Sequence, residues 1–130
     1  MASPFFPLQK EIRRILESDS SLMSKITGVY DYVPERESLP FITIGEGQSQ
    51  PGPWPGAWDV QSIIRIWSDY DGFKEASDIL ADVDRLLSNK HLNVEGFEDA
   101  VTFSPATDDF LDIENGIRGI DATYRVILDG

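Results

Sequence analysis

Hydrophobic residues recur along this chain with two periods, and the changes between them divide it into helices and strands. Over residues 4–17, the three-and-four spacing of one helix face is kept by Leu8, Ile12, Ile15 and Leu16. Over 72–88, the same spacing gives a longer stripe of Phe73, Ala76, Ile79, Leu80, Val83, Leu86 and Leu87. We predict an N-terminal helix, a short second turn after residues 18–21, and one long central helix with Asp71 as its N-cap.

Strands are indicated by alternation over 41–46, 59–69 and the last third of the chain. The strand 59–69 carries apolar residues on both faces, which is typical of a central strand or of one whose outer face a partner covers. In the last third, 98–104, 107–114 and 117–128 predict a three-stranded meander. Its final hairpin turns at Asn115-Gly116. The inward residues of the last strand are Ile120, Ala122, Tyr124, Val126 and Leu128.

These elements predict an α+β fold: an antiparallel sheet of about four to five strands, with the N-terminal helix and the long central helix packed on one face. The chain has 130 residues, a length typical of one domain, so we expect residues 1–130 to form a single domain.

The segment 47–58 is too rich in proline and glycine for a regular element. It holds three prolines and three glycines among twelve residues, so the sequence predicts a long loop. Two tryptophans lie in it, and tryptophan is over-represented at the energetic anchors of interfaces. The predicted interface residues are Trp54, Trp58, Trp67, Gln48 and Gln50. For Trp67 the competing interpretation is packing within the sheet, and for the two loop tryptophans it is folding back onto the domain.

The net charge of the chain limits the kinds of partner that it can bind. Eleven basic residues against 23 acidic ones give a net charge of −12, which argues against gripping a phosphate backbone. The acidity serves solubility, or makes a surface that DNA passes without sticking. There is no cysteine, which excludes disulfides and thiolate metal sites. The N-terminus has no signal-peptide pattern and no apolar run reaches membrane-helix length, so we expect a cytoplasmic protein without a membrane partner.

Candidate chemistry is sparse. The single histidine, His91, is interpreted as a surface residue after the central helix, since nothing near it in sequence could position a general base. An Asp69–Asp71 calcium loop is excluded, because its first ligand position would fall on Trp67. One carboxylate cluster stands out: Asp108, Asp109, Asp112 and Glu114. It is a solvated strand face by default, with a divalent-ion site and an acidic rim lining a pore as the alternatives. No catalytic, metal or cofactor-binding residue is predicted.

An ordered set of short motifs carries a family resemblance. The set consists of Gly28-Val29-Tyr30-Asp31-Tyr32-Val33-Pro34, Leu39-Pro40-Phe41-Ile42-Thr43-Ile44-Gly45-Glu46, Ile66-Trp67-Ser68, the helix start 72–76 and Tyr124-Arg125. In this order the motifs resemble the tail-completion proteins of long-tailed phages, also called tail terminator or head–tail joining proteins.

The resemblance implies a structural virion protein without enzymatic activity or cofactor. Such proteins form a ring, commonly hexameric, that caps the head-proximal end of the tail tube and stops its polymerisation. The implied partners are further copies of the chain, the tail tube protein and the head connector, with DNA passing through the centre. The implied location is the cytoplasm of the producing bacterial cell and then the virion. The alternatives are a head-closure or minor tail connector protein and, remotely, a carboxylate-dependent enzyme built on Asp108–Glu114.

Overall fold

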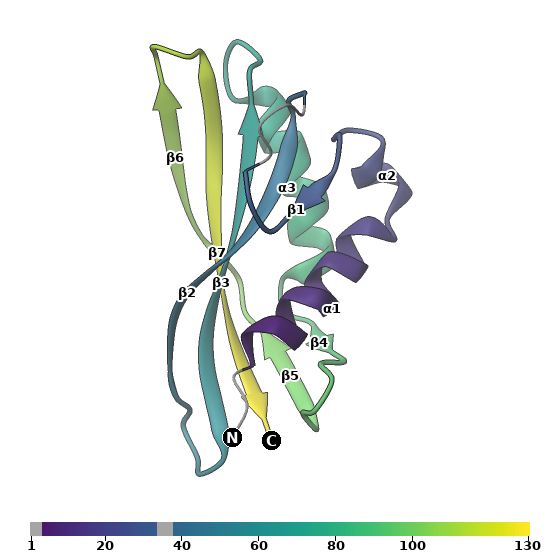
Figure 1. The fold of residues 1–130 in the computed structure, drawn as a ribbon, viewed down its shortest axis with the longest axis vertical. Helices are drawn as coiled ribbons and strands as arrows, with labels where there is room; N and C mark the ends of the chain where they lie inside the picture. Colours follow the sequence, from purple (N-terminus) through teal and green to yellow (C-terminus); the bar gives the residue numbers. More distant parts are fainter. Residues whose placement is uncertain (1–3, 34–37) are drawn as a thin grey trace.

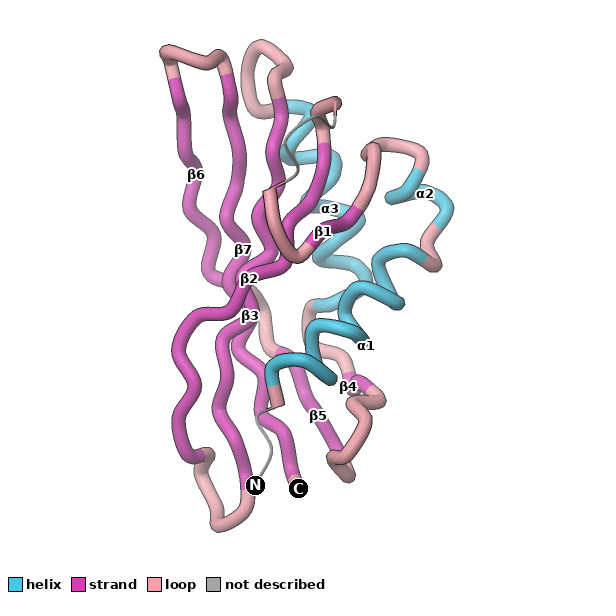
Figure 2. Tube along the Cα trace, viewed as in Figure 1, coloured by secondary structure: helices cyan, strands magenta, loops and turns pink. Residues whose placement is uncertain are grey.

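The computed structural model describes residues 4–33 and 38–130, and these form three helices and seven strands. The helices are α1 (Phe5–Glu17), α2 (Ser20–Met23) and α3 (Lys74–Leu87). They lie together on one side of a strongly twisted sheet (Figures 1 and 2). The α+β class and the packing of both main helices on one face are therefore confirmed. Within the described residues no helix is long and apolar enough to cross a membrane.

The sheet is larger than predicted and is mixed rather than antiparallel. Its strands are β1 (Val29–Tyr30), β2 (Phe41–Pro51), β3 (Ala57–Ser68), β4 (His91–Leu92), β5 (Asp99–Thr102), β6 (Ala106–Asp112) and β7 (Ile117–Asp129). The order is β1-β2-β3-β7-β5-β4, with β6 also on β7, and β1 runs parallel to β2. The prediction of four to five strands was wrong because β1 and β4 have two residues each, too few to show alternation. The Pro34 of the Val33-Pro34 motif lies outside the described residues.

Strand β7 organises the C-terminal third, which is not a meander. Its first half pairs with β6 and its last four residues pair with β5, so both strands share one edge of β7. Its other edge pairs with β3 along the whole length from Ala57 to Ser68. The predicted turn at Asn115-Gly116 is confirmed, with Gly116 at φ 66°, where glycine has no steric penalty. A strand with two successive partners looks the same in sequence as one with a single partner.

The core lies between the helices and one face of the sheet. The alternation predicted for β7 is confirmed, since all five inward residues are buried. Alternate positions of β3 behave likewise: Val60, Ser62, Ile64 and Ile66 face the helices and are buried. Tyr124 is buried among them and donates its hydroxyl hydrogen to Asp84 Oδ1 at 3.2 Å. Strand β3 is central, as its two apolar faces predicted.

Helix α3 begins later than predicted and without the expected cap. Gly72 has φ +95°, which breaks the helix before Phe73, and Phe73 makes no side-chain cap. The hydroxyl of buried Ser68 accepts from the Tyr70 backbone N–H at 3.1 Å and donates to the Glu75 side chain in the first turn of α3 at 2.7 Å, so it links the end of β3 to the start of the helix. Asp71 is therefore not the N-cap, because the glycine after it turns the chain away from helical geometry.

Asp82 on α3 joins α2 to α3. Its carboxylate accepts from Lys25 Nζ at 2.8 Å, from Ser21 Oγ at 3.1 Å and from Arg85 at 3.2 Å. The Lys25 ammonium and these further donors hold the pKa of Asp82 below its usual range. Because the charged form is favoured in the folded chain, stability is fully present above the unfolded pKa. It is lost as pH falls through the lower folded pKa.

We expect the urea midpoint to fall as the pH is taken below about 4, the usual aspartate pKa. Asp82→Asn should lower the midpoint at pH 7 and reduce its loss in acid, because the substituted amide does not titrate. The measurement is urea unfolding at pH 7 and pH 3. Asp78→Asn is the control, since Asp78 pairs with exposed Lys74, and exposed pairs contribute little to stability. An unchanged pH difference in Asp82→Asn would show that this junction does not contribute to acid sensitivity.

Candidate assembly surfaces

The outer face of the sheet, away from the helices, carries a row of packed aromatic rings. Tyr30, Phe41, Trp67 and Phe110 come from β1, β2, β3 and β6 and touch in that order, with ring centroids 5.3–5.9 Å apart. Trp67 is half-buried there and donates its indole N–H to Thr43 Oγ1 at 3.0 Å. The row crosses the sheet at right angles to its strands and ties both edges to the centre.

Arg65 covers the middle of this aromatic row. Its guanidinium lies 5.5 Å from the Trp67 ring centroid and 5.3 Å from that of Phe110. It also pairs with both oxygens of Asp121, at 2.5 and 2.7 Å. The hydrogen bonds to Asp121 raise the pKa of Arg65. A second bidentate pair, Arg125 with Asp59, lies on the same face. Sequence reasoning missed this cluster, because only cross-strand register brings its members together.

The segment predicted as a long loop is mostly a β-hairpin. Strand β2 extends to Pro51 and β3 begins at Ala57, so only residues 52–56 form the turn. A register shift between Glu46 and Ser49 lets the two strands continue past the glycines. Pro51 is accommodated because β2 is an edge strand here, where a missing N–H costs no ladder bond. Figure 1 shows this hairpin at the end of the molecule opposite the β6–β7 hairpin.

The predicted interface residues divide between this hairpin and the sheet. Trp54 lies in the turn, 45% exposed, and its indole N–H bonds to Asp129 at 3.2 Å. Trp58 is half-buried and packs against the core. The Gln48 backbone N–H donates to Gln61 Oε1 at 3.2 Å, and Gln50 Nε2 donates to Asp59 at 3.4 Å. Trp54 is thus the indole that remains available at a tip, while Trp67 lies in the aromatic row of the outer face.

The acidic residues gather on the opposite hairpin. Asp108 and Asp109 are exposed on β6, and Glu114 lies in the turn rather than on the strand. Asp112 caps that turn by accepting from the Asn115 side chain at 2.8 Å and backbone at 3.2 Å, and these bonds lower the pKa of Asp112. Among the described residues no three histidine or carboxylate side chains are grouped to hold a metal ion. His91 is exposed, as predicted for a surface residue after the central helix, and it lies in β4, 3.1 Å from Asp99.

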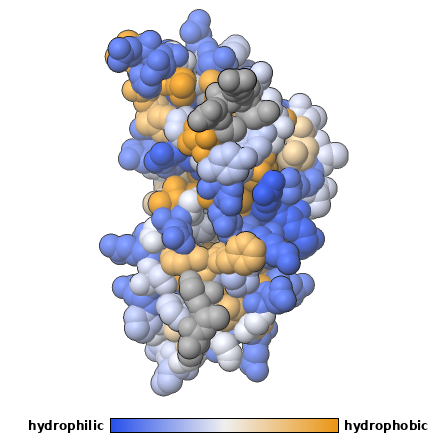
Figure 3. Space-filling view, in the orientation of Figure 1, coloured by the Kyte–Doolittle hydropathy of each residue, from blue (hydrophilic) through white to orange (hydrophobic). Residues whose placement is uncertain are grey.

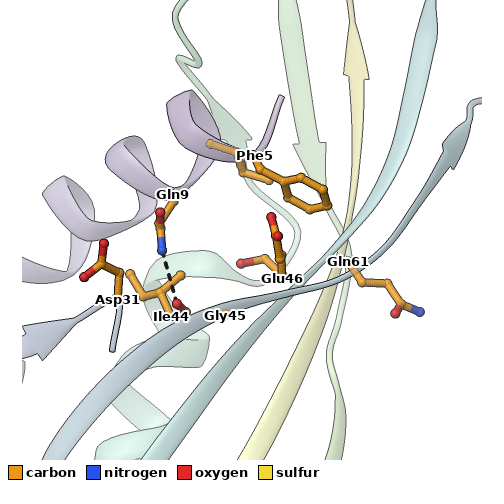
Figure 4. A pocket seen from close by; sticks show the side chains of 9 residues that line it. Phe5, Gln9, Asp31, Ile44, Gly45, Glu46 and Gln61 are labelled. Carbon is orange, nitrogen blue, oxygen red and sulfur yellow. Dashed lines mark hydrogen bonds between the residues drawn. The ribbon is translucent and has the colours of Figure 1, made fainter. Parts of the chain in front are cut away.

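Two adjoining hollows lie where α1 crosses β2. One, of about 300 Å³, is lined by Phe5, Leu8, Gln9, Asp31, Ile44, Gly45, Glu46, Gln61 and Ser62. Figure 4 shows Gln9 directed at β2, where its amide donates to the Ile44 carbonyl oxygen at 3.2 Å. The other, of about 400 Å³, shares Gln9, Asp31 and Ile44 with it and runs along α1. We call this second hollow the α1 groove.

Comparison with known proteins matches nearly the whole chain. Residues 10–129 match the model of the family described as tail completion protein gp17. Comparison with curated proteins gives no match.

Two solved structures have a similar fold. A chain of the virion of a native gene transfer agent particle is 21% identical, with a TM-score of 0.79 over 95% of both chains. The bacteriophage SPP1 gp17 protein is also 21% identical, with a TM-score of 0.55 over 95% of this chain and 88% of its own. These likenesses show the shared fold, and the match over residues 10–129 shows the lineage. The chain belongs to the tail completion protein gp17 family, a family of virion tail assembly components.

Proposed function

We propose that this chain forms an oligomeric ring, a hexamer in the arrangement that the family resemblance implies, at the head-proximal end of a phage tail tube. The ring stops tube polymerisation and joins the tail to the head connector. The observation that carries the proposal is the match of residues 10–129 to the tail completion family. The whole chain, residues 1–130, acts as one tail-terminator domain, made in the bacterial cytoplasm and then incorporated into the virion.

The open edges of the sheet support a ring. Strand β2 has β1 beside it only at Ile42 and Thr43, so within the described residues its edge from Gly45 onward has no strand partner. On the other side of the sheet, the outer edge of β6 is likewise without a described strand. Two unlike edges on opposite sides suit a head-to-tail contact, and such a contact makes a ring when its rotation closes.

The two hairpins suit contacts along the tail axis and with DNA. Trp54, Trp58, Gln48 and Gln50 belong to the β2–β3 hairpin, and we assign its exposed turn to contact with the tube or the connector. Trp67 lies on the outer face of the sheet, where it packs between Phe41 and Phe110 and helps to shape the surface there. Asp108 and Asp109 on β6 form an acidic rim, which with the net charge of −12 keeps DNA phosphates from sticking as the genome passes.

Deletion of the gene tests this function directly. We expect particles without the chain to show tails of uncontrolled length that carry no heads, because nothing caps the growing tube. The measurement is the distribution of tail lengths and the fraction of tails with heads, by electron microscopy, with the gene restored in trans as control. Tails of normal length with heads attached would overturn the proposal. Normal tail length without heads would instead indicate a connector that joins but does not terminate.

A further inference from the structure

The α1 groove is a local concentration of positive charge on an acidic protein. Three of the eleven basic residues, Lys10, Arg13 and Arg14, lie within five positions of α1 and line the groove. Their side chains are 68%, 45% and 64% exposed. Glu17 and Asp31 also line it, so the cations exceed the carboxylates by one, three against two.

These cations have weak partners within the chain. Lys10 lies 3.8 Å from Glu95 and Arg13 lies 3.3 Å from Glu17, in pairs exposed on both sides. Exposed pairs of this kind contribute little to stability, so Lys10 and Arg13 can exchange them for a better partner. Arg14 differs, because it holds buried Glu11 at 2.7 and 3.1 Å. An apolar side chain completes the groove: Phe6, with 73% of its surface exposed.

The tip of the β6–β7 hairpin has the complementary character. Ile113 is 83% exposed and Leu111 is 47% exposed, with Asp112 and Glu114 beside them. No lysine or arginine occurs between Lys90 and Arg118. The bonds from Asn115 to Asp112 fix the shape of the turn, so little order need be gained on docking. Figure 3 shows hydrophobic atoms among hydrophilic ones at the upper left, where Figure 1 places this hairpin.

We propose that residues 111–114 of one copy dock into the α1 groove of the next copy. Ile113 packs against Phe6, and Glu114 lies beside Lys10 and Arg13. The inference rests on the proposed ring and names the contact that builds it. Asp108 and Asp109, further along β6, stay outside the contact and remain free to form the acidic rim.

Charge disfavours contacts between two tips or between two grooves, and the positions of the tip and the groove favour a head-to-tail arrangement. Two hairpin tips facing each other would bring carboxylates together, and two grooves would bring cations together, so both arrangements place like charges opposite each other and are disfavoured. The tip and the groove lie toward opposite edges of the sheet, the tip beyond β6 and the groove between α1 and β2 (Figure 1). Each copy therefore presents one of each, and the contact can repeat around a closed ring.

Disulfide trapping tests the contact without ambiguity, because the chain has no cysteine of its own. Particles are prepared from cells carrying two genes, one with Ile113→Cys and the other with Phe6→Cys, Lys10→Cys or Arg13→Cys in turn. Mild oxidation should link the two chains for at least one groove position, since a disulfide needs Cα atoms within about 7 Å. The control pairs Ile113→Cys with Tyr70→Cys, which is also exposed but lies before α3. A yield no higher than the control at all three positions overturns the proposal.

Charge reversal gives an independent readout. Arg13→Glu should weaken association about tenfold, and Glu114→Lys in the same chain should restore it. Lys74→Glu, at an exposed position of α3 outside the groove, is the matched control and should not change the association. The readout is the occupancy of the chain in purified particles. If the particles contain a ring but show neither disulfide trapping nor charge rescue, this contact is overturned and the proposed function stands. Particles without a ring overturn both.

Discussion

Replacement of Gly119 by valine should lower the free energy of unfolding by about 3 kcal/mol or more, the upper end for overpacking. Gly119 lies on β7 between Trp67 of β3 and Phe110 of β6. A Cβ atom there would overlap the carbonyl oxygen of Ile66 and the ring of Phe110. The ring could rotate away. The carbonyl oxygen belongs to β3, and so the two central strands would have to separate.

The measurement is urea unfolding followed by far-UV circular dichroism. Gly45→Ala is the control, because a Cβ at position 45 meets only the Ile63 carbonyl oxygen, at an ordinary 3.9 Å. That variant should unfold within about 1 kcal/mol of the unsubstituted chain, as edge-strand surface changes do. If Gly119→Val and Gly45→Ala unfold alike, the close approach of β7 to β3 at this position is not present in the folded chain.

Trp67→Ala should cost about 2–3 kcal/mol of stability, somewhat below the range for a fully buried tryptophan. The indole packs between Phe41 and Phe110, with the Arg65 guanidinium above it. Its removal also leaves Thr43 without the indole N–H that it accepts. The loss should therefore appear in the isolated chain, before any assembly, as a lower urea midpoint.

Trp54→Ala is the matched comparison, since Trp54 is exposed and its indole N–H donates to Asp129. We expect a loss within about 0.5 kcal/mol, the usual scatter of surface changes, together with fewer tails joined to heads. The same assembly defect from Trp67→Ala at unchanged urea midpoint would contradict the packing role and make Trp67 an interface residue.

Most of the helices and the strand phases could be predicted from the sequence, because burial imposes a period on each element. The predicted stripe of α1 and the predicted alternation of β3 and β7 are present in the structure, because each element is long enough to bury one face against the core. The pairing of these strands is harder to predict from the sequence. β5 and β6 share one edge of β7, and nothing in a single strand's pattern tells which residues of a long strand pair with which partner.

The β2–β3 hairpin shows how composition can mislead. Prolines and glycines in 47–58 favoured a loop, yet an edge strand tolerates Pro51 and a register shift absorbs the glycines. Strand β2 extends to Pro51 because it pairs with β3, which in turn pairs with β7. The local sequence of β2 does not show these pairings. The prediction of Asp71 as the helix N-cap was wrong for a related reason, since Gly72 turns the chain away from helical geometry.

The candidate surfaces were predictable only in part. The acidic residues of β6 and the exposed Trp54 could be named from sequence, whereas the Arg65 cluster needs four strands in register. The residues of the α1 groove could have been recognised in the sequence, although the basic residues scattered along the rest of the chain hide their grouping. Phe6, Lys10, Arg13 and Glu17 follow the spacing of one helix stripe, opposite the buried stripe of Leu8, Ile12 and Leu16. Recognising it requires asking what an amphipathic helix shows to solvent as well as what it buries.

A cryo-electron microscopy reconstruction of the head–tail junction, in particles that carry this chain, would show whether the chain forms the proposed ring. We expect a closed ring of copies of this fold around the DNA path, between the last tube ring and the connector. Each β6–β7 hairpin should lie against α1 of its neighbour. A junction without this fold, or the fold found elsewhere in the tail, would contradict the proposed function.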